Sequence, residues 1–207
     1  CIRDRCEPLQ VLHKQRITHG DIKPGNIFIA ADGRFMLGGF GLASASIGIP
    51  SAASLPMIGG TLAYMSPEHS SRTPHPVNAL SDIYSLGIVF YELLTGDLPF
   101  GAPDDGQAEW IHHHIASPPR LTPLQRAEVP PMLAAIVLRL LAKSPEHRYQ
   151  TVAGLLADLR RCQATLTVGG DIASFTPGLQ DSVPGRYLTD TLCTTHPQAR
   201  ELVAVFN

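Results

Sequence analysis

Residues 19–26 read His-Gly-Asp-Ile-Lys-Pro-Gly-Asn, and the apolar run Ile-Phe-Ile-Ala follows at residues 27–30. The stretch lies between a helix-like and a strand-like segment and carries an acid, a cation and an amide at Asp21, Lys23 and Asn26. Loops held by a rigid scaffold commonly present reactive side chains. An aspartate can accept a proton from a hydroxyl, a lysine can neutralise a phosphate, and an asparagine oxygen can ligate a hard metal ion. We therefore interpret residues 19–26 as a candidate catalytic loop.

The composition favours a soluble globular chain. Its 207 residues are 44% hydrophobic and carry a formal net charge of −2, which argues against a nucleic-acid partner. No apolar run reaches the roughly 18 residues of a membrane helix. Four cysteines without a C-x-x-C pair indicate a reducing, cytoplasmic location: Cys1, Cys6, Cys162 and Cys193. Because the chain starts on a cysteine without a signal-peptide pattern, we expect it to be part of a longer protein.

Apolar periodicity and turn residues predict a mainly helical order of elements. Residues 27–30 and 35–37 flank Asp-Gly and predict a short hairpin. The longest helix should span residues 82–96, with Ser81 as its N-cap and Gly96 ending it, and it should be buried on nearly all sides. Prolines between residues 118 and 131 indicate a linking segment. Further helices are expected to end near residue 16 and to span residues 107–116, 132–142 and 152–162.

Three more motifs follow the candidate loop. Residues 59–68 read Gly-Gly-Thr-Leu-Ala-Tyr-Met-Ser-Pro-Glu, the long helix begins Asp-Ile-Tyr-Ser-Leu-Gly, and residues 144–151 read Ser-Pro-Glu-His-Arg-Tyr-Gln-Thr. In this order and spacing the four motifs resemble the large C-terminal lobe of a serine/threonine protein kinase, over roughly residues 9–162. The resemblance implies an α+β, mainly α-helical fold of the protein-kinase type, with only the C-terminal lobe present and the short hairpin at the catalytic cleft.

The resemblance also implies a role for each residue of the candidate loop. Asp21 would be the catalytic base for a substrate hydroxyl, and Lys23 would contact the transferred phosphoryl group of ATP. Asn26 would bind the nucleotide through a Mg²⁺ ion, and Thr61 together with Lys23 follows the serine/threonine pattern. Structural alternatives remain at this point: Asp21 could cap its own loop, Lys23 could be a solvated surface lysine, and Asn26 could form a turn.

Three further residues are expected to be structural anchors. By resemblance, Glu68 and Arg148 form a buried ion pair that holds the activation segment, and Asp82 has a structural role. The histidine run at residues 112–114 raises the question of a metal site. Neighbours on a helix point about 100° apart and cannot share one ion, so we do not expect a metal there.

Two glycines depart from the kinase pattern. Gly20 replaces the usual arginine of the catalytic loop, and Gly39 replaces the aspartate of Asp-Phe-Gly, thirteen residues after Asn26. In the family that aspartate holds magnesium on the nucleotide phosphates, and glycine has no oxygen to offer. Because the small lobe is also absent from these residues, we expect the chain alone to be inactive. The alternative is a pseudokinase, a regulatory or protein-binding module.

The chain is expected to divide at residue 162. Residues 1–162 would be the kinase lobe, and residues 163–207 a linker and the start of a following domain, for which the resemblance implies an ATPase module. The strings resemble the kinase-like domain at the front of large bacterial signalling proteins that also carry a histidine kinase. The partners implied are ATP with Mg²⁺, and a protein substrate or a regulated domain of the same parent chain.

Overall fold

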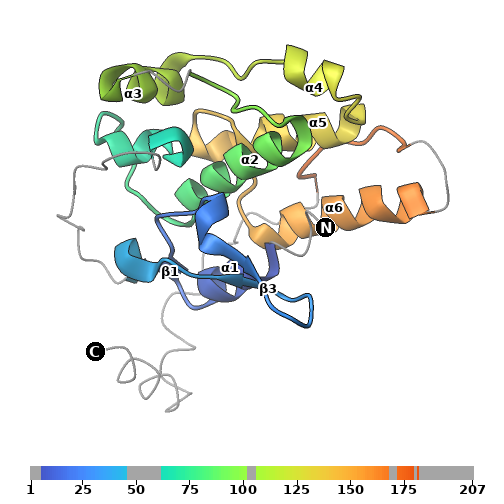
Figure 1. The fold of residues 1–207 in the computed structure, drawn as a ribbon, viewed down its shortest axis with the longest axis horizontal. Helices are drawn as coiled ribbons and strands as arrows, with labels where there is room; N and C mark the ends of the chain where they lie inside the picture. Colours follow the sequence, from blue (N-terminus) through green and yellow to red (C-terminus); the bar gives the residue numbers. More distant parts are fainter. Residues whose placement is uncertain (1–5, 46–61, 102–105, 168–171, 180, 182–207) are drawn as a thin grey trace.

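The computed structural model describes residues 6–45, 62–101, 106–167, 172–179 and 181 (Figure 1). The described part is mainly helical, as predicted, and its strands form two antiparallel pairs, β1 with β4 and β2 with β3. The α-helices are α1 (Cys6–Lys14), α2 (Ala79–Thr95), α3 (Gln107–Ala116), α4 (Thr122–Arg126), α5 (Pro131–Leu140) and α6 (Val152–Thr167). The strands are β1 (Ile17–Thr18), β2 (Ile27–Ile29), β3 (Phe35–Leu37) and β4 (Ser44–Ala45).

Helix α2 is the central element, and every residue from Ser81 to Tyr91 is buried. The prediction that Ser81 caps this helix is wrong. The N-cap is Asn78, whose side chain accepts the Leu80 N–H at 2.8 Å, while the Ser81 hydroxyl accepts the Asn78 N–H at 3.2 Å in a capping box. The helix ends as predicted at Gly96, which has a φ of 75° and donates its N–H to the Glu92 carbonyl.

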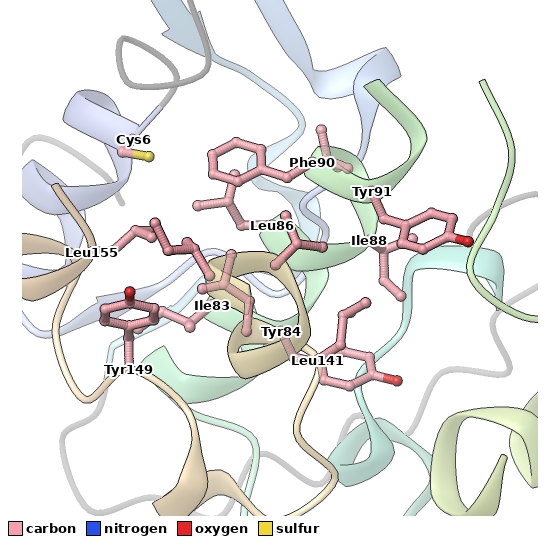
Figure 2. Close-up of a cluster of buried hydrophobic side chains, with 14 of the residues drawn as sticks. Cys6, Ile83, Tyr84, Leu86, Ile88, Phe90, Tyr91, Leu141, Tyr149 and Leu155 are labelled. Atoms are coloured by element: carbon pink, nitrogen blue, oxygen red, sulfur yellow. The ribbon is translucent and has the colours of Figure 1, made fainter. Parts of the chain in front are cut away.

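The hydrophobic core surrounds α2 (Figure 2). Helix α5 packs closely against it at Gly87, where an added Cβ would lie 2.7 Å from the Leu140 Cβ. Each fully buried large apolar side chain contributes about 1.5–3 kcal/mol to folding. The fully buried members labelled in Figure 2 come from α1, from α2, from the turn before α6 and from α6 itself: Cys6, Ile83, Tyr84, Ile88, Phe90, Tyr91, Tyr149 and Leu155.

The predicted hairpin is confirmed, with Phe28 of β2 opposite Met36 of β3. Gly33 supplies the left-handed turn residue, with a φ of 82°. The second pair was not predicted: β1 joins β4, with Thr18 opposite Ser44. This pairing closes residues 17–45 into a loop that contains both the candidate site and the hairpin. Strand β1 directly precedes residues 19–26, and β4 follows the segment that contains Gly39.

The remaining helices differ from the prediction mainly at their ends. The helix over residues 107–116 is confirmed. Helix α5 begins at Pro131, and α6 continues past residue 162 to Thr167. The proline-rich segment contains a short helix, α4, which was not predicted; its Pro123 stands in the first turn, where a missing N–H costs no hydrogen bond. No described helix is both long and apolar enough to cross a membrane.

Candidate active site

The candidate loop is attached to the start of the central helix by Asp82. One carboxylate oxygen of Asp82 accepts the His19 N–H and the other accepts the Gly20 N–H, both at 2.8 Å. The His13 ring adds a third contact through Nε2 at 2.9 Å. Asp82 is 1% exposed, and a hydrogen bond to a charged acceptor stabilises by about 1.5–3 kcal/mol. The expected anchor is therefore present, and it acts on the backbone of the loop.

The His19 side chain connects the loop to the segment after β3. Its Nε2 lies 2.8 Å from the Gly38 carbonyl, and its Nδ1 lies 3.2 Å from the Asp21 N–H. Because a carbonyl only accepts and an N–H only donates, Nε2 carries the proton and Nδ1 is the acceptor. The buried ring also packs against Phe40, with the ring centroids 5.0 Å apart. His19 thus orients Asp21 relative to the segment that contains Gly39.

The carboxylate of Asp21 is contacted by both Lys23 and Asn26. The Lys23 Nζ lies 2.7 Å from Asp21 Oδ2, and the Asn26 Nδ2 donates to the same oxygen and to the Asp21 carbonyl, each at 2.8 Å. Asp21 Oδ1 is buried and has no hydrogen-bond partner among the described residues. The carboxylate therefore has one oxygen held by donors and one buried oxygen that meets no donor among the described residues.

A tight turn brings Asn26 back to Asp21. Residues Pro24–Asn26 form a 3₁₀ turn, η2, in which the Asn26 N–H donates to the Lys23 carbonyl at 3.0 Å. The fixed φ of proline suits the first position of such a turn. The third predicted catalytic residue, Thr61, lies outside the described residues, and its role stays a prediction.

The magnesium site of the family is incomplete here. Gly39 has a φ of 77°, and a Cβ added to it would lie 2.4 Å from three atoms of the Asn26 side-chain amide. The Asn26 amide thus occupies the space that a side chain at residue 39 would need. Among the described residues no three His, Cys, Asp or Glu side chains gather where they could hold a metal ion. The residues present do not fit the complete ATP–Mg²⁺ site.

The three histidines of α3 point in different directions. His112 is exposed, the His113 ring contacts the Ser117 hydroxyl at 2.9 Å, and His114 is fully buried. The His114 Nε2 donates to the Leu62 carbonyl at 2.9 Å, directly after the segment that contains Thr61. This contact was not predicted, since the run of histidines was considered only for a metal.

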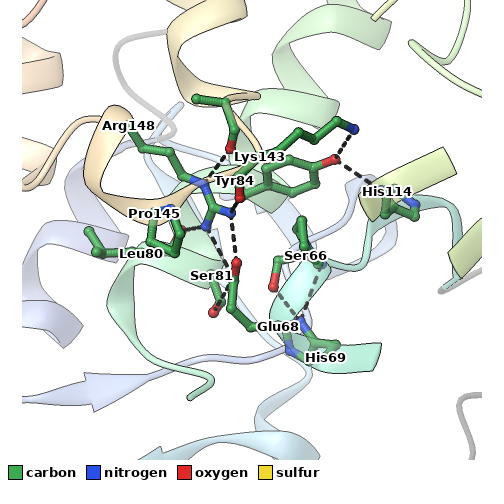
Figure 3. A network of polar contacts seen from close by, with 12 residues as sticks. Ser66, Glu68, His69, Leu80, Ser81, Tyr84, His114, Lys143, Pro145 and Arg148 are labelled. Atoms are coloured by element: carbon green, nitrogen blue, oxygen red, sulfur yellow. Dashed lines mark hydrogen bonds and ion pairs between the residues drawn. The ribbon is translucent and has the colours of Figure 1, made fainter. Parts of the chain in front are cut away.

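Lys143 and Tyr84 complete the surroundings of His114 (Figure 3). The Tyr84 hydroxyl lies 3.1 Å from His114 Nδ1, and the Lys143 Nζ donates to the His113 carbonyl at 2.9 Å. Burial, followed by the charge of Lys143, lowers the pKa of His114 to about 3. Burial and the charge of Arg148 lower the pKa of Lys143 to about 7. The cluster therefore holds a neutral imidazole against the Leu62 backbone.

The predicted ion pair between Glu68 and Arg148 is confirmed (Figure 3). The guanidinium holds the carboxylate with two hydrogen bonds, of 2.7 and 3.1 Å, and the Ser81 hydroxyl donates to the same carboxylate at 2.9 Å. Burial alone would raise the pKa of Glu68, but the hydrogen bonds and charge of Arg148 outweigh it and hold that pKa below its usual value.

Arg148 is fully buried, and all five of its N–H groups are used. Besides the two bonds to Glu68, it donates to three backbone carbonyls, at 2.8–2.9 Å. These carbonyls belong to Leu80, Ala142 and Lys143. A buried ion pair is stable only when its remaining donors are satisfied, and this one meets that condition. It connects the segment around Glu68 to the start of α2 and to the turn before α6.

These features define a protein kinase lobe: a candidate catalytic loop anchored on a buried central helix, and a buried Glu–Arg pair that joins the segment around Glu68 to the turn before α6. A family profile described as "Protein kinase domain" matches residues 2–158. The chain belongs to the protein kinase family.

Its relatives include bacterial serine/threonine kinases. The chain is 40% identical over 161 residues to serine/threonine-protein kinase PknB of Mycobacterium leprae (strain TN), covering 77% of this chain and 25% of that protein. It is 33% identical to the probable serine/threonine-protein kinase SCO3848 of Streptomyces coelicolor, over 81% of this chain and 24% of that protein.

A relative of another architecture is hybrid signal transduction histidine kinase G of Dictyostelium discoideum. It is 47% identical over 108 residues, which are 52% of this chain and 3% of that protein. The chain thus spans about a quarter of the length of the kinases it matches and far less of the hybrid protein.

Proposed function

We propose that the chain supplies the hydroxyl-activating lobe of a serine/threonine protein kinase domain. The observation that carries this proposal is the Asp21 carboxylate, with Oδ1 buried and unpartnered among the described residues and Oδ2 held by Lys23 and Asn26. A carboxylate oriented in this way can take the proton of a serine or threonine hydroxyl. In this family ATP with Mg²⁺ supplies the phosphoryl group.

Each side chain of the loop has a separate task in this proposal. Asp21 accepts the hydroxyl proton at Oδ1, and Asn26 fixes the carboxylate by holding its other oxygen and the Asp21 carbonyl. Lys23, 2.7 Å from the same oxygen, keeps a positive charge beside the reacting hydroxyl. Asp82 and His19 are positioning residues, since they hold the loop backbone and orient Asp21. Thr61 would complete the substrate side.

We further propose that the parent protein places a small lobe over the hairpin. Four large apolar side chains on β2, β3 and the following turn are 47–62% exposed: Phe28, Ile29, Met36 and Phe40. Exposed apolar patches mark interaction sites, and this patch adjoins the catalytic loop. Without the small lobe and a carboxylate at residue 39, the isolated chain would not transfer phosphate.

A cytoplasmic signalling role fits the same set of observations. Cys6 and Cys162 are both buried, and neither belongs to a C-x-x-C pair, as expected for a protein of a reducing compartment. The parent chain would carry the substrate or regulated domain itself or meet a protein substrate, in a role like that named for the hybrid relative.

Gly39 supports a second candidate, a pseudokinase. The Asn26 amide fills the space beside Gly39 that an aspartate would need. The carboxylate that holds magnesium in the family is therefore missing, and its place is occupied by the amide. A domain of this kind would keep the fold and bind partners without transferring phosphate.

The first experiment measures radiolabel transfer from ATP to a generic basic protein by the chain itself. We expect none above the level of Asp21→Asn. Transfer that Asp21→Asn abolishes would contradict the expected inactivity.

The second experiment separates kinase from pseudokinase by changing Gly39→Asp in the longer protein that includes the small lobe. Aspartate tolerates the left-handed backbone found at residue 39, and Asn26 can rotate away from it. We expect Mg²⁺-dependent nucleotide affinity to rise and turnover to increase on the order of a hundredfold.

Gly33→Asp is the matched control for that experiment. Gly33 has a similar φ of 82° and open space around it, and it lies in the hairpin turn. It adds the same charge away from the loop and should change neither quantity. If Gly39→Asp also changes neither, the pseudokinase is the better conclusion.

A further inference from the structure

The chain turns back after α6 and packs on it. Residues 172–179 and Asp181, here called the strap, lie against α6 and the core. Ile172 and Phe175 are partly buried against the core, and the Arg161 guanidinium lies 4.3 Å from the centre of the Phe175 ring. The Gly178 N–H donates to the Asp158 carboxylate at 2.6 Å. The same oxygen of Asp158 accepts the Tyr149 hydroxyl, so the strap joins a buried polar contact of the lobe.

Asp181 holds the two residues directly before α6 from a remote place in the sequence. Its Oδ1 accepts the Thr151 N–H at 3.1 Å and the Thr151 hydroxyl at 2.6 Å, and its Oδ2 accepts the Gln150 N–H. The Thr151 Oγ1 in turn accepts the Gly154 N–H at 2.9 Å. Thr151 thus serves an N–H of the first turn of α6, and the Asp181 carboxylate holds Thr151 in place. Its negative charge is also favourable beside the N-terminus of the helix.

Two glycines make room for the strap. A Cβ on Gly154 would lie 2.3 Å from the Asp181 carboxylate, although glycine inside a helix is less stable than alanine. Gly178 has a φ of 71°, and its Cβ would lie 2.7 Å from the Arg139 Nε. Both positions therefore need glycine only when the strap is in place.

We propose that the strap is a built-in clamp, and that it fixes the chain after residue 181 to the turn that carries the Glu68–Arg148 pair. Asp181 holds Gln150 and Thr151, which directly follow Arg148 and Tyr149. A force applied to the chain beyond Asp181 is transmitted to this turn. Through the Arg148–Glu68 contact it also reaches the segment around Glu68. The residues after α6 are in this view part of the kinase lobe and not a free linker.

The first test is amide hydrogen exchange on the whole chain with Asp181→Asn. The reporter is the Gly178 amide, because its own acceptor, Asp158, is not altered. Losing charge-assisted bonds at Asp181 should release the strap and speed exchange at Gly178 by about tenfold or more. Asp97→Asn, at an exposed residue, is the charge-matched control and should leave the Gly178 rate unchanged. An unchanged Gly178 rate in Asp181→Asn overturns the clamp.

The second test depends on the sign of one change in Tm. If the strap were a free linker, Gly154→Ala would improve the helix and raise the Tm. With the strap docked, the new Cβ meets the Asp181 carboxylate, so the Tm should fall and exchange at Gly178 should accelerate. A raised Tm overturns the clamp. Both measurements are independent of phosphoryl transfer, so they stand apart from the proposed function.

Discussion

Replacing Arg148 with methionine should destabilise the chain more than any single surface change. Methionine has a similar length and no N–H groups, so the substitution removes all five hydrogen bonds of the guanidinium. The Glu68 carboxylate, with a side chain 1% exposed, then keeps only hydroxyl donors among the described residues, those of Ser66 and Ser81. Removing one partner of a buried ion pair costs about 3–5 kcal/mol, because it leaves an uncompensated charge.

The assay is urea unfolding at pH 7, analysed for its midpoint and slope, together with the Tm. For a chain of this size the loss corresponds to a fall in Tm of about 10 °C. Arg148→Lys keeps the charge but has three donors in place of five, so it should lie between wild type and Arg148→Met. Arg34→Met is the control, because Arg34 pairs with Asp32 at the surface and is 79% exposed; it should show no measurable change.

The pH dependence gives an independent check of the same pair. The pKa of Glu68 is lowered in the folded state, so its contribution is present above the unfolded pKa, near 4.5, and is lost as the pH falls through the folded pKa. In Arg148→Met burial outweighs the remaining hydroxyl hydrogen bonds to Glu68, its pKa rises, and stability should increase on acidification. A free energy of unfolding within about 0.5 kcal/mol of wild type for Arg148→Met would refute the reasoning.

Three further predictions concern other parts of the lobe. Because the pKa of His114 is lowered to about 3, the unfolded chain takes up a proton at a higher pH than the folded chain does. The free energy of unfolding should therefore fall from about pH 6.5 toward pH 3, by up to about 1.4 kcal/mol per pH unit. His114→Gln should flatten this part of a pH–stability curve, and an unchanged curve would contradict the prediction. Gly87→Ala should lower the free energy of unfolding by about 1 kcal/mol, since overpacking against Leu140 exceeds the gain in helix propensity; a higher Tm would be the contrary result. Ser44→Glu should leave the activity and partner binding of the parent protein unchanged, because Gly20 provides no arginine to pair with the new charge; a large gain in either assay would count against this.

The sequence alone determined the elements whose signals are local. Ile27 and Phe35 begin strands on either side of an Asp-Gly turn, and this pattern predicts the hairpin without any distant contact. The long helix and its end at Gly96 follow from apolar residues on every face and a residue that tolerates positive φ. The Glu68–Arg148 pair also came from the sequence, through the resemblance of two motifs eighty residues apart.

The start of the central helix α2 was predicted less well than its end at Gly96. The start of α2 was placed at Ser81, whereas Asn78 caps it, because both are good capping residues and three residues separate them within one capping box. The geometry of the full first turn chooses between them. Single-residue propensities do not contain this information.

The tertiary structure alone decided which distant groups serve the site. The Asp82 carboxylate holds the backbone of His19 and Gly20, the His114 ring holds Leu62, and Asp181 holds the backbone directly before α6. Judged from its sequence neighbours alone, each of these side chains could equally have been exposed to solvent. Its partner is a backbone group, which every residue possesses, so no residue type marks it in the sequence. Only the packing of α2, α3 and α6 brings donor and acceptor within hydrogen-bond distance and removes water from both.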